Sequence, residues 1–184
     1  MKKTKTKDKK YPLKIILTTG EKMTIPKQSE FDNDFLRHHG CSLMAEYIAL
    51  QFFKIHKWPI NLYKWHKKNT PKSIKGKVTV YGIYHGISHF IKGKGTAIYH
   101  SHPTKEKIQK AMDAGSLVIL EQKDPIHTVI LIPDGEEMYV ASYGKVKKTD
   151  AKTQANKATK NETYRGMIVI HKNPAKKKAK KAKK

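Results

Sequence analysis

The order of two hydrophobic patterns along the chain restricts its fold more than any other feature. Through most of the stretch from Cys41 to Met112, apolar residues recur at spacings of three and four, which is typical of helices with a buried face. The later part instead carries short β-branched runs separated by turn sequences: Leu117–Leu120, Thr128–Ile132, Met138–Ala141 and Met167–Ile170. Helices followed by such strands predict an α+β fold with an antiparallel sheet.

Local signals place further elements. We expect an N-terminal hairpin, a helix that begins close to Cys41, a helix capped by Asn61, and a helix that ends at Gly115. The expected ranges are Lys14–Thr19 with Lys22–Ile25 for the hairpin, Asn61–Asn69, Val80–Ile91 and Pro103–Met112 for helices, and Thr96–Tyr99 for a strand. The polar segment Lys145–Thr163 shows no apolar stripe, and we interpret it as a long exposed connection.

The charge is concentrated at the two ends of the chain. The 184 residues suit one domain, and 39 Lys and Arg against 15 Asp and Glu give a net charge of +24. Residues 1–10 contain six lysines and residues 172–184 contain eight. We therefore predict a single domain over residues 11–171 between disordered basic ends.

These lysine-rich ends could neutralise phosphates or other anions without sequence preference. They contain no recognisable groove-reading motif, so the expected partner is a polyanion bound non-specifically, or none if the ends only aid solubility.

Several classes of protein are excluded. No apolar run approaches the roughly 18 residues of a membrane span, and Leu13–Leu17 is too short for a signal peptide. We expect a cytoplasmic protein. Its single cysteine, Cys41, cannot form an intramolecular disulfide or a cysteine-rich zinc site.

Cys41 is the first candidate for chemistry. At the start of a helix, free backbone N–H groups and the helix dipole favour a thiolate. A nucleophilic cysteine also needs a base, and His127 at the start of a strand is the best candidate. The alternatives are a small buried cysteine and an exposed histidine at a strand end.

The order of these parts resembles a known family. Gly40-Cys41-Ser42-Leu43-Met44-Ala45 is similar to the nucleophile helix of papain-like cysteine peptidases, especially the bacterial branch like the double-glycine-leader (bacteriocin-processing) peptidases. The later helix ending at Gly115, the strand Leu117–Leu120 and then His127-Thr128-Val129-Ile130-Leu131 follow the same order. The resemblance covers roughly residues 30–146.

The resemblance implies a papain-like fold, in which the nucleophile helix and a helical layer pack on the antiparallel sheet. It also implies cofactor-free cleavage of a peptide or amide bond. Cys41 would attack the carbonyl, and His127 would take up the proton and return it to the leaving group. Ser142 stands near the place of the Asp or Asn that usually orients the histidine, and Phe35 stands where the family has an oxyanion glutamine. Asn33 is the nearby candidate for that second role.

Two other functions stay open. The chain could be a catalytically silent member of the same fold that binds nucleic acid or an acidic surface through its basic residues. In addition, His100, His102 and Asp113 resemble the zinc ligands of metal-dependent isopeptidases, with Glu46 as the catalytic base. Lys110 stands where that second family has a serine, and a cation fits poorly beside a metal ion.

Overall fold

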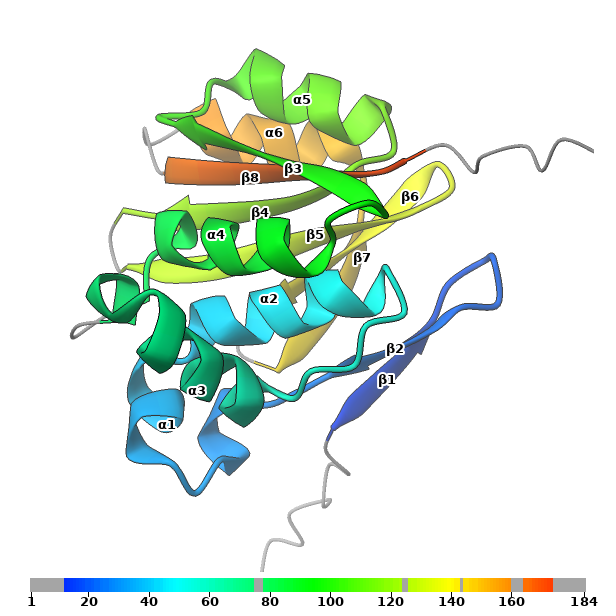
Figure 1. Cartoon of the computed structure of the whole chain (residues 1–184). Helices are drawn as coiled ribbons and strands as arrows, with labels where there is room; N and C mark the ends of the chain where they lie inside the picture. The colour runs from blue at the N-terminus through cyan, green and yellow to red at the C-terminus, as the bar shows by residue number, and fades with distance from the viewer. Residues whose placement is uncertain (1–11, 75–77, 124–125, 143, 160–163, 174–184) are drawn as a thin grey trace, which may run out of the picture.

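The computed structural model describes residues 12–74, 78–123, 126–142, 144–159 and 164–173 (Figure 1). The helices are α1 (Asp34–His39), α2 (Cys41–Gln51), α3 (Pro59–Asn69), α4 (Val80–Phe90), α5 (Lys105–Asp113) and α6 (Ala151–Thr159), with 3-10 turns η1 (Gln28–Glu30) and η2 (Pro71–Ile74). The strands are β1 (Leu13–Ile16), β2 (Lys22–Ile25), β3 (Gly95–Ser101), β4 (Leu117–Gln122), β5 (His127–Asp134), β6 (Glu137–Ser142), β7 (Lys145–Thr149) and β8 (Tyr164–Lys172).

A six-stranded sheet forms the centre of the molecule, in the order β3-β8-β4-β5-β6-β7. All of its neighbouring strands are antiparallel, as are β1 and β2 of the separate hairpin. The prediction of a mixed fold of helices and antiparallel sheet is therefore confirmed.

Helices cover both faces of this sheet. Helices α2 and α4 lie on one face, whereas α5 and α6 lie together on the other (Figure 1). Successive residues of a strand point to opposite faces. In β5, Ile130 and Ile132 accordingly join the hydrophobic cluster beneath α2, and Val129 and Leu131 join the cluster beneath α5.

Helix α2 is enclosed along nearly its whole length. Every residue from Ser42 to Gln51 is buried, because α3, α4, β2 and β5 all pack against the helix. A helix that is apolar on all sides is typical of a buried core element. Cys41 alone, at its first turn, is half-exposed.

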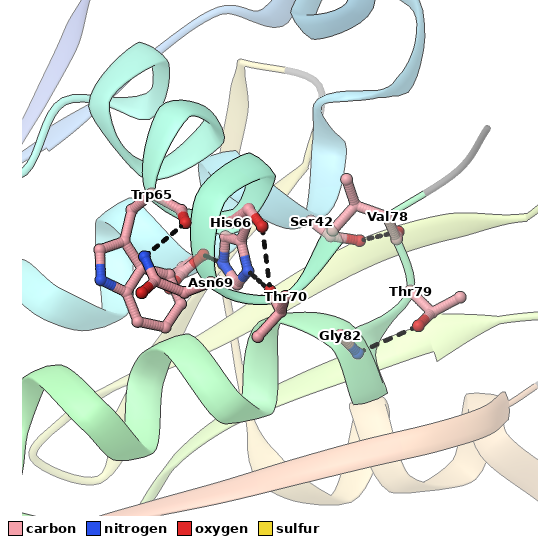
Figure 2. A network of polar contacts seen from close by, with 9 residues as sticks. Ser42, Trp65, His66, Asn69, Thr70, Val78, Thr79 and Gly82 are labelled. Carbon is pink, nitrogen blue, oxygen red and sulfur yellow. Dashed lines mark hydrogen bonds and ion pairs between the residues drawn. The ribbon is translucent and has the colours of Figure 1, made fainter. Parts of the chain in front are cut away.

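The buried α2 also carries a polar contact to α3. Glu46 Oε2 lies 2.8 Å from His66 Nε2, and both side chains are fully buried. His66 Nδ1 lies 2.7 Å from Thr70 Oγ1 (Figure 2). Burial raises the pKa of Glu46, while His66 opposes that rise. Gly86 of α4 packs directly over this pair, where a Cβ atom would lie 2.8 Å from the His66 ring.

The N-terminal hairpin is tied to the rest of the molecule by side chains. Asp134 Oδ1 accepts hydrogen bonds from the backbone N–H and the hydroxyl of Thr18, at 2.6 and 2.7 Å. The side-chain amide of Gln51 bonds both the N–H and the C=O of Thr24, each at 2.8 Å. These contacts hold the hairpin against the C-terminal end of α2 and the end of β5.

Three details differ from the sequence predictions. Of the predicted exposed connection Lys145–Thr163, the described part forms β7 and α6, and residues 160–163 lie outside the described part of the chain. Gln154 and Ala155 of α6 are buried, but one is polar and the other is small, so no apolar stripe in the sequence indicates this helix. Helix α3 begins at Pro59, so Asn61 is not its cap. Lys172 belongs to β8, whereas residues 1–10 and 174–184 lie outside the described part of the chain.

Candidate functional site

A tight turn between two helices positions Cys41. Gly40 ends α1 and directly precedes α2. A Cβ atom on Gly40 would lie 2.9 Å from Leu36 Cα, so only glycine fits this junction without a shift. Cys41 is therefore the first residue of α2, as the sequence predicts.

The hydroxyl group of Thr128 on β5 faces the thiol of Cys41. Cys41 Sγ donates toward Thr128 Oγ1 at 3.8 Å, and Thr128 Oγ1 lies 2.7 Å from Ser42 Oγ. Ser42 Oγ donates to the backbone carbonyl of Val78 at 2.8 Å (Figure 2). A carbonyl can only accept, so the single proton of Ser42 is used there, and Thr128 must donate to Ser42. Thr128 therefore offers Cys41 a lone pair of a hydroxyl group.

His127 precedes Thr128 in β5, and its side chain points to the opposite face of the sheet. Val129 and Leu131, two and four residues further on, pack in the cluster beneath α5, and His127 shares their side of the sheet. There His127 Nε2 lies 2.5 Å from Ser142 Oγ, so the structure brings together two of the predicted site residues. It does not bring together Cys41 and His127.

Burial also affects the charge of His127. The side chain is 2% exposed, and desolvation lowers its pKa to about 4. At neutral pH the ring is therefore uncharged, and it holds a proton weakly. In the structure, His127 contacts Ser142, whereas the sequence predicts that it pairs with Cys41.

Asn33 has a local structural contact. Its Oδ1 accepts from the N–H of Leu36 at 3.1 Å, which makes Asn33 the N-cap of α1. Phe35, which occupies the sequence position of the family's glutamine, stacks on Tyr63 of α3 with ring centroids 4.7 Å apart. Neither residue lines the pocket beside Cys41.

Gln28 is the polar residue that sequence reasoning missed. It lines the Cys41 pocket, its Nε2 donates to the backbone carbonyl of Arg37 at 3.0 Å, and its side chain is 9% exposed. Its Oε1 is buried with no hydrogen-bond partner among the described residues. The resemblance points to a position about six residues before Cys41, whereas the intervening α1 lets a more distant glutamine reach the pocket.

Five elements contribute to this pocket: β2, η1, α2, β5 and β6. Its walls are largely apolar, and the polar residues in its lining are Gln28, Cys41, Thr128 and Ser142, of which Ser142 directs its hydroxyl group to His127. The complete lining is Ile25, Pro26, Gln28, Cys41, Met44, Ala45, Ile48, Thr128, Ile130, Ala141, Ser142 and Gly144. An apolar pocket with a few convergent polar groups is the usual form of a ligand site.

The residues of the zinc alternative are dispersed. His100 lies in β3 and His102 follows it with a positive φ of 50°, while Asp113 ends α5 and accepts from Gln109 at 2.7 Å. Within the described ranges, no three His, Cys, Asp or Glu side chains are placed so that they could hold a metal ion. The structure therefore does not bring His100, His102 and Asp113 together.

Comparisons with known proteins support the fold. No family model matches the sequence, and no curated protein matches it. A crystal structure described as a "putative C39-like peptidase" from Bacillus anthracis is similar, with a TM-score of 0.52 and 15% sequence identity. The similarity covers 88% of this chain and all of the other. The fold is thus similar to that of a C39-like peptidase.

Helix lengths bear on membrane insertion. None of the helices in the described part of the chain combines the length and apolar content that crossing a membrane requires.

Proposed function

We propose that this chain is a non-hydrolytic domain with a C39-peptidase-like fold, which binds a polypeptide segment at the Cys41 pocket. The fold similarity supports the kind of ligand, because the similar protein is described as a peptidase. The contents of the pocket support the loss of hydrolysis.

One observation carries the proposal: Thr128 Oγ1 is the group that faces Cys41 Sγ, at 3.8 Å. A cysteine nucleophile needs a neighbouring base that removes its proton. A threonine hydroxyl is not such a base at neutral pH, and here its own proton is directed to Ser42. This contact supports a Cys41 that keeps the place of a nucleophile at a helix start but, among the described residues, contacts no base that would activate it.

The pocket suits an amide-containing ligand. Ile25, Met44 and Ile48 form an apolar wall, and the space beside it admits only a small group of the ligand. The buried Oε1 of Gln28 can accept one hydrogen bond, which the N–H of a peptide group would donate. Leaving such an acceptor unpaired costs free energy, so a donor-bearing ligand gains affinity by satisfying it.

Binding can be tested with immobilised random synthetic peptides and the full chain, before and after alkylation of Cys41 by N-ethylmaleimide. We expect a subset of peptides to bind, and alkylation to abolish that binding because the adduct fills the pocket mouth. The matched control is Cys41→Ser, which the reagent cannot modify there and which should bind in both conditions. Absence of binding in every sample would contradict the proposal.

Hydrolysis is measured on the same peptides in solution by mass spectrometry. The proposal predicts intact peptides after prolonged incubation. New peptide termini that vanish in both Cys41→Ser and His127→Gln would instead establish the Cys41–His127 hydrolase and overturn the proposal.

A further inference from the structure

The outer face of α4 carries a row of exposed ring-bearing side chains. Tyr81, His85 and His89 are four residues apart, so they lie above one another on a single helix face. All three are exposed, and Tyr81 is 52% exposed. The ring of Tyr81, at one end of this row, is therefore accessible to solvent.

Ring contacts extend this row onto the neighbouring elements. At one end, Tyr81 meets Tyr99 of β3 with ring centroids 5.0 Å apart and stacks on Tyr84 at 6.4 Å. At the other end, His89 lies 5.0 Å from Trp65 of α3. We call the set of Tyr81, Tyr84, His85, His89, Trp65 and Tyr99 the α4 ridge. Figure 1 shows α4 on the outside of the sheet, between β3 and α3.

The ridge lies in a part of the chain without acidic residues. Residues 47–105 contain eleven lysines and six histidines, and no Asp or Glu. Lys64, Lys67 and Lys68 of α3 are exposed beside Trp65.

Two carboxylates from other segments lie beneath α4, and neither is left unpaired. Glu46 is bonded to His66, and Glu121 lies 2.8 Å from Arg165 Nε and accepts from the N–H of Val80. Both are buried, so the ridge offers rings and positive charge to solvent.

From these observations we infer that the α4 ridge binds single-stranded nucleic acid. Bases stack on exposed aromatic rings, and neighbouring lysines neutralise the phosphates. An acidic polypeptide would use the lysines but leave the tyrosine faces without stacking partners. The 11 residues of α4 span about 16 Å, enough for a few nucleotides. None of the ridge residues lines the Cys41 pocket, so this inference is independent of the proposed function.

The test is fluorescence anisotropy of the full chain with a labelled deoxythymidine dodecamer, a duplex of equal length and polyglutamate, at moderate salt. The variants are Tyr81→Ala, which removes an exposed ring, and the double variant Lys64→Gln with Lys68→Gln. The matched control is Lys145→Gln with Lys147→Gln, which removes equal charge from exposed positions of β7 at the far sheet edge. All variants keep the lysine-rich ends.

We expect Tyr81→Ala to weaken dodecamer binding about tenfold and to leave duplex binding unchanged, because stacking requires unpaired bases. The Lys64/Lys68 variant should lose more affinity for the dodecamer than the Lys145/Lys147 variant. Equal losses in the two double variants, or wild-type affinity in Tyr81→Ala, would overturn the inference in favour of general polyanion contact. Polyglutamate binding as tight as dodecamer binding would overturn it in favour of an acidic polypeptide.

Discussion

Thr128 Oγ1 lies 3.8 Å from Cys41 Sγ, and no imidazole nitrogen takes part in that contact. The adjacent His127 points to the opposite face of the sheet, where it contacts Ser142. Side chains of a strand point alternately to its two faces. A shift of one residue along β5 would therefore place the imidazole of His127, rather than the hydroxyl group of Thr128, beside the thiol.

The hydroxyl pair of Ser42 and Thr128 should be measurable as a coupling energy. Both side chains are buried, and the Oγ–Oγ1 distance is 2.7 Å. In a double-mutant cycle with Ser42→Ala and Thr128→Val, we expect the double variant to be more stable than additivity predicts by about 1 kcal/mol. Urea unfolding measures this difference. Strict additivity would show that the two hydroxyl groups do not bond.

Acidification should destabilise the fold through His127. Its folded pKa of about 4 lies below the unfolded value near 6.5, so the unfolded chain binds the proton first as the pH falls. The stability contribution is complete above pH 6.5 and is lost between pH 6.5 and 4, by up to about 3 kcal/mol. The measurement is the free energy of unfolding as a function of pH, compared between the wild type and His127→Gln.

In His127→Gln this part of the pH dependence should vanish, although the variant itself is less stable. Stability curves of the two proteins that run parallel from pH 7 to pH 4 would contradict the neutral, buried state of His127.

Gly86→Ala should change the free energy of unfolding in the opposite direction from an ordinary glycine-to-alanine substitution in a helix. In an exposed helix, alanine stabilises relative to glycine by about 1 kcal/mol. Here the new Cβ would lie 2.8 Å from the ring of His66 and press on Glu46, so we expect a loss of about 2 kcal/mol. Ser88→Ala in the same helix is the control and should be neutral or stabilising, since Ser88 Oγ is buried without a partner among the described residues. A stabilised Gly86→Ala protein would show that α4 does not approach the pair this closely.

The sequence predicts the elements around the site better than it predicts their contacts. The helix at Cys41 is predictable because Gly40 and the apolar spacing after it are local signals. The sheet face to which His127 points is not predictable, because Val129, Ile130, Leu131 and Ile132 are all buried, half of them against each helical layer. A strand covered on both sides shows no apolar-polar alternation, so its sequence does not reveal which residue faces α2.

Gln28 and α6 were missed for related reasons. Gln28 reaches the pocket only because α1 turns the chain back before Cys41, which is a tertiary effect. Helix α6 packs through Ala155 and Gln154, residues whose burial no hydrophobic pattern indicates.

The proposed function requires that His127 does not activate Cys41. The most direct test is the rate of Cys41 alkylation by iodoacetamide at pH 7, in the wild type and in His127→Gln, with both proteins verified as folded by circular dichroism. The structure predicts rates that agree within about twofold, because the imidazole lies across the sheet from the thiol. A fall of about tenfold or more in His127→Gln would show a working Cys–His pair and would contradict the account.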